Sequence, residues 1–158
     1  MANTQAMTTS FMGELMTATH NFGVAPIRAA TTADTFKGAL YLTTATVNAS
    51  TTAYSVTNEV SGSGYTPGGV TVTFGTAPIA TNSSATAGVA FVTPSASITY
   101  TTVTLATAFD AVLIYNSTQA DKAVSVHTFG SQTVTAGTFT LTMPANTTST
   151  ALIRLATT

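Results

Sequence analysis

The sequence contains no cysteine and no tryptophan, and it has only four basic and five acidic residues in 158. Without cysteine the chain can form no disulfide, thiolate nucleophile or zinc–thiolate site. Four Lys and Arg side chains cannot neutralise many phosphates, so neither nucleic acid nor an anionic membrane is an expected partner. No apolar run approaches the length of about 18 residues that a membrane-spanning helix needs. The N-terminus lacks the pattern of a secretory signal, so we expect a chain made in the cytoplasm and left unprocessed.

Groups that could perform catalysis are also scarce. His20 and His127 are the only histidines, and no serine lies in a G-x-S-x-G turn. The closest pair of carboxylates, Asp110 and Asp121, lies eleven positions apart in the sequence. Two distant histidines form no recognisable set of metal ligands. We therefore predict a protein that is not an enzyme and uses no cofactor and no metal.

The abundant residue is threonine, which occupies 38 of the 158 positions. Its β-branched side chain is stiff in a helix and favours the extended backbone. Leu, Ile, Val and Phe together make up only about a fifth of the chain, which is close to the lower limit for a packed core. With a net charge of only −1, the surface repels other copies of itself weakly. We infer that contacts outside the monomer supply part of the stability.

From Phe36 onward, apolar residues alternate with threonine or other small residues, which is the two-residue period of a half-buried strand. Strands are predicted at residues 36–42, 53–60, 70–74, 88–93, 97–105, 111–115, 123–129, 138–143 and 151–155. Turn signals separate them at residues 62–69, 82–84, 116–121, 130 and 144–146. Many short strands at this spacing predict an all-β fold, specifically an antiparallel β-sandwich or a jelly-roll-like domain.

The N-terminal part has a different pattern. Residues 4–19 predict a short helix, with Asn3 as a possible N-cap and an apolar face formed by Phe11, Leu15 and Ala18 and widened by Met12 and Met16. Gly23 and Pro26 then interrupt the helical pattern. We therefore expect an N-terminal helix with its connecting arm over residues 1–34, followed by a β-sandwich domain over residues 35–158.

A glycine-rich stretch at residues 61–69 superficially resembles a phosphate-binding loop. It lacks the G-K-[ST] ending and no helical pattern follows it, so we interpret it as a long turn. Glycines also allow another backbone to approach closely, which makes this loop a candidate for contact between subunits. Together with the apolar helix face, it gives the candidate assembly contacts Phe11, Leu15, Met16, Gly62, Gly64, Tyr65, Gly68 and Gly69.

Several segments of the chain resemble a group of small virion proteins of tailed bacteriophages. They are residues 35–41, 52–54, 58–69, 111–116, 122–124, 129–130 and 151–155, together with His20-Asn21-Phe22 at the end of the predicted helix. The resemblance therefore spans nearly the whole chain. This sequence departs from the group mainly at residues 23–32, which leaves the junction between helix and sheet open.

The resemblance implies a non-enzymatic structural protein located in the virion. A capsid decoration, or cement, protein is the function we expect, with self-association into a homo-oligomer, preferably a trimer, and with the major capsid protein or other virion proteins as partners. A structural or adhesive component of the tail or fibre is the alternative. A carbohydrate-binding module is a third class, but it would need an exposed aromatic patch, and the tyrosines are expected to be ordinary strand residues. Flat threonine arrays of the ice-binding kind need a regular repeat, which this sequence lacks.

Overall fold

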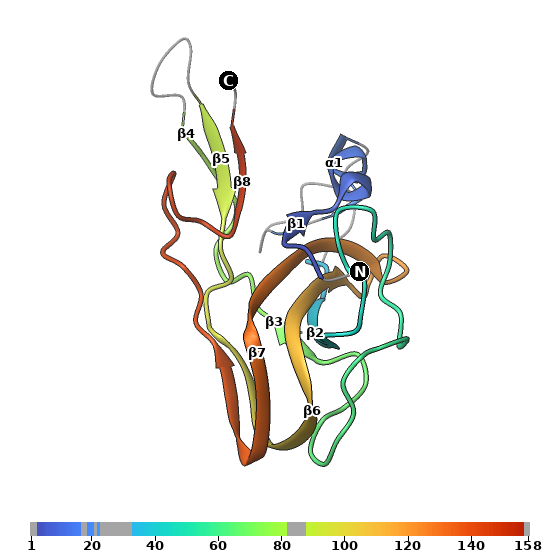
Figure 1. Cartoon of the computed structure of the whole chain (residues 1–158). Coiled ribbons are helices and arrows are strands. Elements are labelled where there is room, and N and C mark those ends of the chain that lie inside the picture. Colours follow the sequence, from blue (N-terminus) through green and yellow to red (C-terminus); the bar gives the residue numbers. More distant parts are fainter. Residues whose placement is uncertain (1–2, 17–18, 21, 23–32, 82–87, 157–158) are drawn as a thin grey trace. The chain divides into compact units, whose positions relative to one another are not determined.

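The computed structural model describes residues 3–16, 19–20, 22, 33–81 and 88–156, and these form a mostly β fold (Figure 1). The elements are β1 (Ala6–Met7), α1 (Thr9–Met16), β2 (Phe36–Leu42), β3 (Val70–Val72), β4 (Ile79–Thr81), β5 (Val89–Val92), β6 (Ile98–Asn116), β7 (Lys122–Leu141) and β8 (Ile153–Ala156). Every strand pairing among them is antiparallel. The predicted all-β, antiparallel class is confirmed.

The chain divides into two compact units, each built from separate stretches of sequence. The first unit contains residues 1–20, 34–72 and 98–141, and the second contains residues 21–33, 73–97 and 142–158. The five-stranded sheet β1-β7-β6-β2-β3 belongs to the first unit, and the three-stranded sheet β4-β5-β8 belongs to the second.

The first unit is organised by one long hairpin, in which β6 and β7 run side by side as a curved ribbon (Figure 1). Its register shifts where residues 106–108 of β6 lie opposite one residue of β7, and again where residues 129–131 of β7 lie opposite one residue of β6. Such bulges bend a strand and increase its twist. Phe109, Phe129 and Phe139 pack their rings together here, with centroid distances of 5.0 to 5.9 Å.

The centre of this sheet is buried on both faces, which explains the continuous apolar run at residues 111–115. On one face, Ala39 and Tyr41 of β2 pack with Leu113 of β6 and its neighbours. On the other face, the Tyr100 hydroxyl donates a 2.8 Å hydrogen bond to the Gly38 carbonyl oxygen. A strand covered on both sides loses the alternation that a half-buried strand shows.

The second unit has a smaller sheet. Ile79, Phe91 and Arg154 are opposite one another across its three strands, and Ala80, Ala90 and Leu155 form the neighbouring row. Phe22 contacts Phe74 edge to face at a centroid distance of 4.9 Å. Ile79 and Leu155 remain about 40 % exposed.

Several of the predicted elements differ from the structure, and one of the predicted strands is absent. Residues 53–60 form no strand and make only isolated bridges, Ala53 with Lys122 and Glu59 with Tyr41. The turn predicted at Gly130 lies instead inside β7, where a bulge accommodates the glycine and lets two predicted strands join into one. The predicted turn at residues 82–84 lies outside the described residues.

The N-terminal boundaries also differ from those predicted. Ala6–Met7 pairs with β7 as β1, so α1 covers only Thr9–Met16 of the range 4–19. Thr8 occupies the N-cap position, where its hydroxyl oxygen accepts a hydrogen bond from the Phe11 N–H at 3.4 Å. Asn3 instead ties the N-terminus to the sheet, accepting from the Val47 N–H and donating to the Leu42 carbonyl oxygen.

Candidate assembly surface

The glycine-rich loop lies directly against its own sheet. A Cβ atom on Gly62 would lie 2.0 Å from the Thr104 carbonyl oxygen, and one on Gly69 would lie 1.7 Å from the Gly38 carbonyl oxygen. Ser63 forms an antiparallel bridge with Thr104. The glycines are therefore required by contact within the chain, while the outer side of residues 61–64 is exposed and open to a neighbour.

One buried carboxylate holds this loop in place. Glu59 is 7 % exposed, and it accepts hydrogen bonds from the Tyr54 hydroxyl at 2.6 Å, the Tyr65 hydroxyl at 2.6 Å and the Gly68 N–H at 2.8 Å. The Tyr65 hydroxyl in turn accepts a 3.0 Å hydrogen bond from the Leu40 N–H of β2. Hydrogen bonds to a charged acceptor are stronger than those between neutral groups. Glu59 therefore makes the main polar connection between the loop and the sheet.

All five tyrosines of the chain lie around the Glu59 carboxylate. Tyr54 stacks on Tyr115 at a centroid distance of 4.7 Å, and Tyr65 stacks on Tyr100 at 5.9 Å. The Tyr115 hydroxyl donates to the Gly68 carbonyl oxygen at 2.8 Å, and the Tyr41 hydroxyl donates to the Ser55 carbonyl oxygen at 2.5 Å. The tyrosines thus bind residues 54–69 to β2 and β6.

The pKa of every one of these tyrosines is raised, first of all by burial. For Tyr41 the pKa is raised to about 12 from its usual 10.0. The hydrogen bonds that Tyr54 and Tyr65 donate to the Glu59 carboxylate raise the pKa of both hydroxyls further, since a tyrosinate cannot donate.

We expect the tyrosines of this cluster to lose their protons only as the protein unfolds. The folded state prefers the protonated hydroxyls, so stability is complete below pH 10 and falls as the pH rises through about 12. In a spectrophotometric titration, tyrosinate absorbance should stay flat through pH 10 and then rise in one step together with loss of circular dichroism. In guanidinium the same five tyrosines should titrate near pH 10. A tyrosine that ionises near pH 10 in the folded protein would contradict the expectation.

Part of the apolar face predicted for the N-terminal helix is used inside the first unit. Phe11 is fully buried and packs edge to face against His20, with a centroid distance of 4.9 Å. Leu15 is half-buried, and the side chain of Met16 lies outside the described residues. Phe11 is therefore unavailable to another subunit in this conformation, whereas Leu15 keeps part of its surface exposed.

A polar network fastens α1 to the ends of β6 and β7. The Lys122 ammonium lies 2.6 Å from Glu14, and His20 Nε2 lies 2.7 Å from the other Glu14 oxygen. Asn116 Nδ2 lies 3.1 Å from His20 Nδ1 and 2.8 Å from Asp34. Burial lowers the pKa of His20 even though Glu14 opposes the shift. This histidine connects the helix segment to the end of β6.

The amide of Asn116 determines which nitrogen of His20 carries the proton. Asn116 Oδ1 accepts hydrogen bonds from the backbone N–H groups of Thr118 and Gln119, so its Nδ2 must face the histidine. His20 Nδ1 then accepts, and Nε2–H donates to Glu14. This arrangement suits the neutral imidazole.

The structure brings together one serine–histidine pair that sequence reasoning missed. Ser125 Oγ lies 2.9 Å from His127 Nε2, because positions two apart on β7 share a face of the strand. Burial lowers the pKa of His127 to about 4. Ser125 is only 3 % exposed, so a substrate could not reach its oxygen in this conformation. The spacing Ser-x-His on a predicted strand is the signal that could have found the pair.

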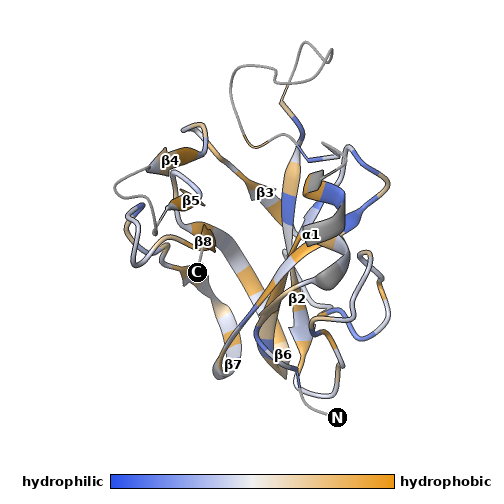
Figure 2. Cartoon of the chain, turned by 90° about the horizontal axis from the view of Figure 1, so that it is seen from above, coloured by the Kyte–Doolittle hydropathy of each residue, from blue (hydrophilic) through white to orange (hydrophobic). Residues whose placement is uncertain are grey.

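The exposed part of the β6–β7 ribbon is lined by threonines. The term threonine surface is used below for the exposed and half-exposed threonines of this ribbon, which are Thr99, Thr101, Thr102, Thr104, Thr107, Thr133, Thr135, Thr138 and Thr140. No charged residue occurs between Glu59 and Asp110 or between Lys122 and Arg154. In Figure 2, β7 is accordingly mostly pale or orange, whereas blue positions lie beside α1.

The glycine-rich loop adjoins the threonine surface. Ser63 pairs with Thr104, and a recess of about 120 Å³ is lined by Tyr65 and Gly69 of the loop together with Thr99 and Thr101 of β6. Of the predicted assembly contacts, the structure therefore places Gly62, Gly64, Tyr65 and Gly69 beside the threonine surface, whereas Gly68 is buried next to Tyr115. Phe11 and Leu15 instead lie on α1.

Comparison of the chain with protein-family models, curated proteins and solved structures finds no match. Within the described residues, no group of three or more His, Asp or Glu side chains is placed to hold a metal ion. The described part of the chain has no helix of the length and hydropathy needed to cross a membrane.

Proposed function

We propose that this protein is a non-enzymatic structural protein of a bacteriophage virion, and specifically a capsid decoration or cement protein. In this proposal the chain is made in the host cytoplasm, self-associates, with a trimer as the favoured form, and binds the major capsid protein of the head lattice. We further propose the β-sandwich or jelly-roll-like architecture with a short N-terminal helix that the sequence predicts, and the antiparallel sheets of the described residues support it.

The observation that carries the proposal is the uncharged threonine surface with the adjoining glycine-rich loop. Burying a charged group without a partner costs far more free energy than burying a hydroxyl that can find a hydrogen bond. The buried cores of protein interfaces are accordingly depleted in charged residues. A neighbour can therefore cover this surface with little loss of hydration energy, as a lattice-bound protein requires.

Stabilisation of the shell follows from mass action. A protein that binds only the assembled lattice shifts the assembly equilibrium toward it, by an amount set by its affinity and concentration. No group transfer, cofactor or metal is needed for this activity. The proposal therefore assigns the scarce titratable residues to folding, in agreement with the positions of Glu59, His20 and Glu14 in buried networks.

We expect particles that lack this protein to rupture at lower temperature and on milder osmotic shock than complete particles. Adding back the purified protein should restore resistance, whereas adding back a Thr138→Lys/Thr140→Lys variant should not, because it would bury two charges. Thr57→Lys, an exposed change away from the threonine surface, serves as the matched control. Equal resistance of complete and deficient particles would contradict the head role, and a few copies per particle instead of hundreds would support the tail or fibre alternative.

A further inference from the structure

Side chains hold α1 against the sheet of the first unit. Phe11 is fully buried, and Glu14 contacts both Lys122 of β7 and His20, which follows the helix. His20 in turn contacts Asn116 at the end of β6. A change in the hydrogen bonding of His20 therefore acts directly on the attachment of α1 to the sheet.

His20 lies in a buried position between two aromatic rings. The Phe11 ring meets it edge to face at a centroid distance of 4.9 Å, and the Phe36 ring of β2 stacks on it at 6.4 Å. The histidine is 8 % exposed. Because a buried imidazolium loses much of its hydration, this environment favours the neutral ring.

The charged groups around His20 come from different parts of the first unit. In the described residues they are Glu14 of α1, Asp34 before β2 and Lys122 of β7. Burial has the largest influence and lowers the pKa of His20 below its usual 6.5, although the two carboxylates oppose this shift. Burial raises the pKa of Glu14, but its hydrogen bonds with Lys122 and His20 bring it below the usual 4.5. Glu14 therefore keeps its charge as His20 is protonated.

Asn116 opposes a second proton on His20. Its Nδ2 group donates to His20 Nδ1 at 3.1 Å and to the Asp34 carboxylate at 2.8 Å. Its Oδ1 accepts from the backbone N–H groups of Thr118 and Gln119 at 3.1 and 3.2 Å. The amide cannot turn round without losing these bonds and placing its oxygen against the Asp34 carboxylate. A proton on His20 Nδ1 would therefore point at another donor.

We propose that α1 and His20 form an acid-sensitive latch. In the closed form, neutral His20 accepts a hydrogen bond from Asn116. Protonation of Nδ1 in mild acid breaks this bond and releases α1 from the ends of β6 and β7. Release exposes Phe11, one of the predicted assembly contacts, which is fully buried in the closed form. The inference concerns regulation and does not depend on the head-lattice role.

The direction of the pH effect follows from the two states of His20. In the open latch the ring is in water and titrates at its usual pKa of 6.5, whereas in the closed latch its pKa is lowered. The open form therefore binds more protons, and acid favours it. Above pH 6.5 the closed latch keeps its full stability. Below it, the equilibrium shifts toward the open form by up to about tenfold for each pH unit, until the lowered pKa of the closed form is reached.

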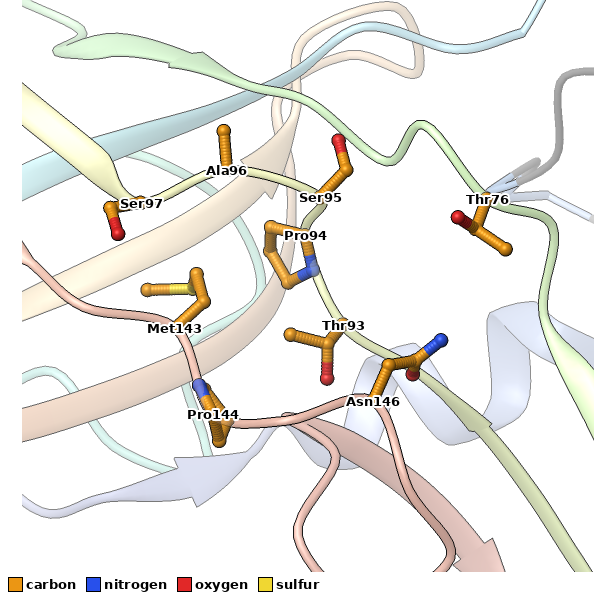
Figure 3. Close-up of a pocket in the computed structure, with 9 residues that line it drawn as sticks. All are labelled: Thr76, Thr93, Pro94, Ser95, Ala96, Ser97, Met143, Pro144 and Asn146. Carbon is orange, nitrogen blue, oxygen red and sulfur yellow. The ribbon is translucent and has the colours of Figure 1, made fainter.

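Amide hydrogen exchange of the isotope-labelled full-length protein, followed by NMR at about pH 7.5 and about pH 5, tests the latch. Rates are compared as protection factors, which remove the intrinsic effect of pH on exchange. We expect the protection of the α1 amides to fall about tenfold or more at the lower pH, while the β2 amides keep theirs. The Ser95 amide is a second reference. It donates to the Thr73 carbonyl oxygen at 2.8 Å and borders a pocket of the second unit that no titratable side chain lines (Figure 3).

Two variants test whether His20 is the responsible group. His20→Gln has no titrating group at this position, so its α1 protection should be equal at both pH values. The double variant Asn116→Asp/Asp34→Asn reverses the hydrogen bonding at constant net charge. Its carboxylate at position 116 still accepts from Thr118 and Gln119, and it also accepts from a protonated Nδ1. The α1 protection of the double variant should therefore stay constant or rise in acid.

His127→Gln is the matched control, because burial also lowers the pKa of His127, to about 4. This variant should lose α1 protection as the parent protein does. Three results would overturn the proposal. The α1 protection of the parent protein stays constant between the two pH values, it falls only together with that of β2, or it falls equally in His20→Gln or the double variant.

Discussion

Gly69→Ala is expected to lower the free energy of unfolding by about 3 kcal/mol or more. The new Cβ would lie 1.7 Å from the Gly38 carbonyl oxygen and 2.9 Å from the Ala39 Cα, and both are backbone atoms of a central strand. Gly69 also has a φ of +72°, which an alanine adopts only at a cost. The loop must then move away from β2, and urea unfolding followed by circular dichroism measures the loss.

Gly130→Ala provides the matched control for this substitution. Nothing lies within 4 Å of a Cβ placed on Gly130, and its backbone is not among those with positive φ. We expect its unfolding free energy to change by no more than about 0.5 kcal/mol. Equal effects of the two alanines would show that the loop does not pack on β2 as described.

Glu59→Ala is expected to cost about 3 to 5 kcal/mol of unfolding free energy, because three donors lose their acceptor at about 1 to 3 kcal/mol each. The change leaves the Tyr54 hydroxyl, the Tyr65 hydroxyl and the Gly68 N–H without their shared acceptor. Each unpaired buried donor loses its hydration without compensation. The midpoint of urea unfolding measures the loss.

The conservative variants test whether hydrogen bonding causes this loss. Glu59→Gln keeps one acceptor oxygen and the volume of the side chain, so it should lose clearly less than the alanine variant. Tyr54→Phe removes one hydroxyl and should cost about 1 kcal/mol. If Glu59→Gln were as unstable as Glu59→Ala, the negative charge would be the important property. If Glu59→Gln and Glu59→Ala were both as stable as the parent protein, the hydrogen bonds of Glu59 would not contribute to the unfolding free energy.

The strands with clear alternation could be predicted from the sequence. Phe36–Leu42 was predicted with its observed bounds, and the strand at residues 70–74 was predicted two residues too long. The prediction is correct there because successive residues of a strand face opposite sides of the sheet, so the alternation of apolar and polar residues is visible in the local sequence. The length of β6 and β7 could not be predicted, because bulges at residues 106–108 and 129–131 join segments that a local pattern separates.

The candidate site was predictable only in part. The glycine-rich loop was correctly identified as a place of close backbone approach, but the approaching backbone belongs to Thr104 and Gly38 of the same chain. The strand expected at residues 53–60 failed because Glu59 and Tyr54 bond to each other and hold the segment as a loop. A buried carboxylate with partners distributed over residues 54–68 leaves no periodic signal in the sequence.

The division of the chain into interleaved units has a mechanical consequence. The backbone passes between the units at residues 20/21, 33/34, 72/73, 97/98 and 141/142. Ile98 and Leu141, the ends of β6 and β7 that continue into the second unit, are also paired with each other. A force applied through these two crossings therefore pulls β6 and β7 in the same direction, so it does not separate the two strands from each other.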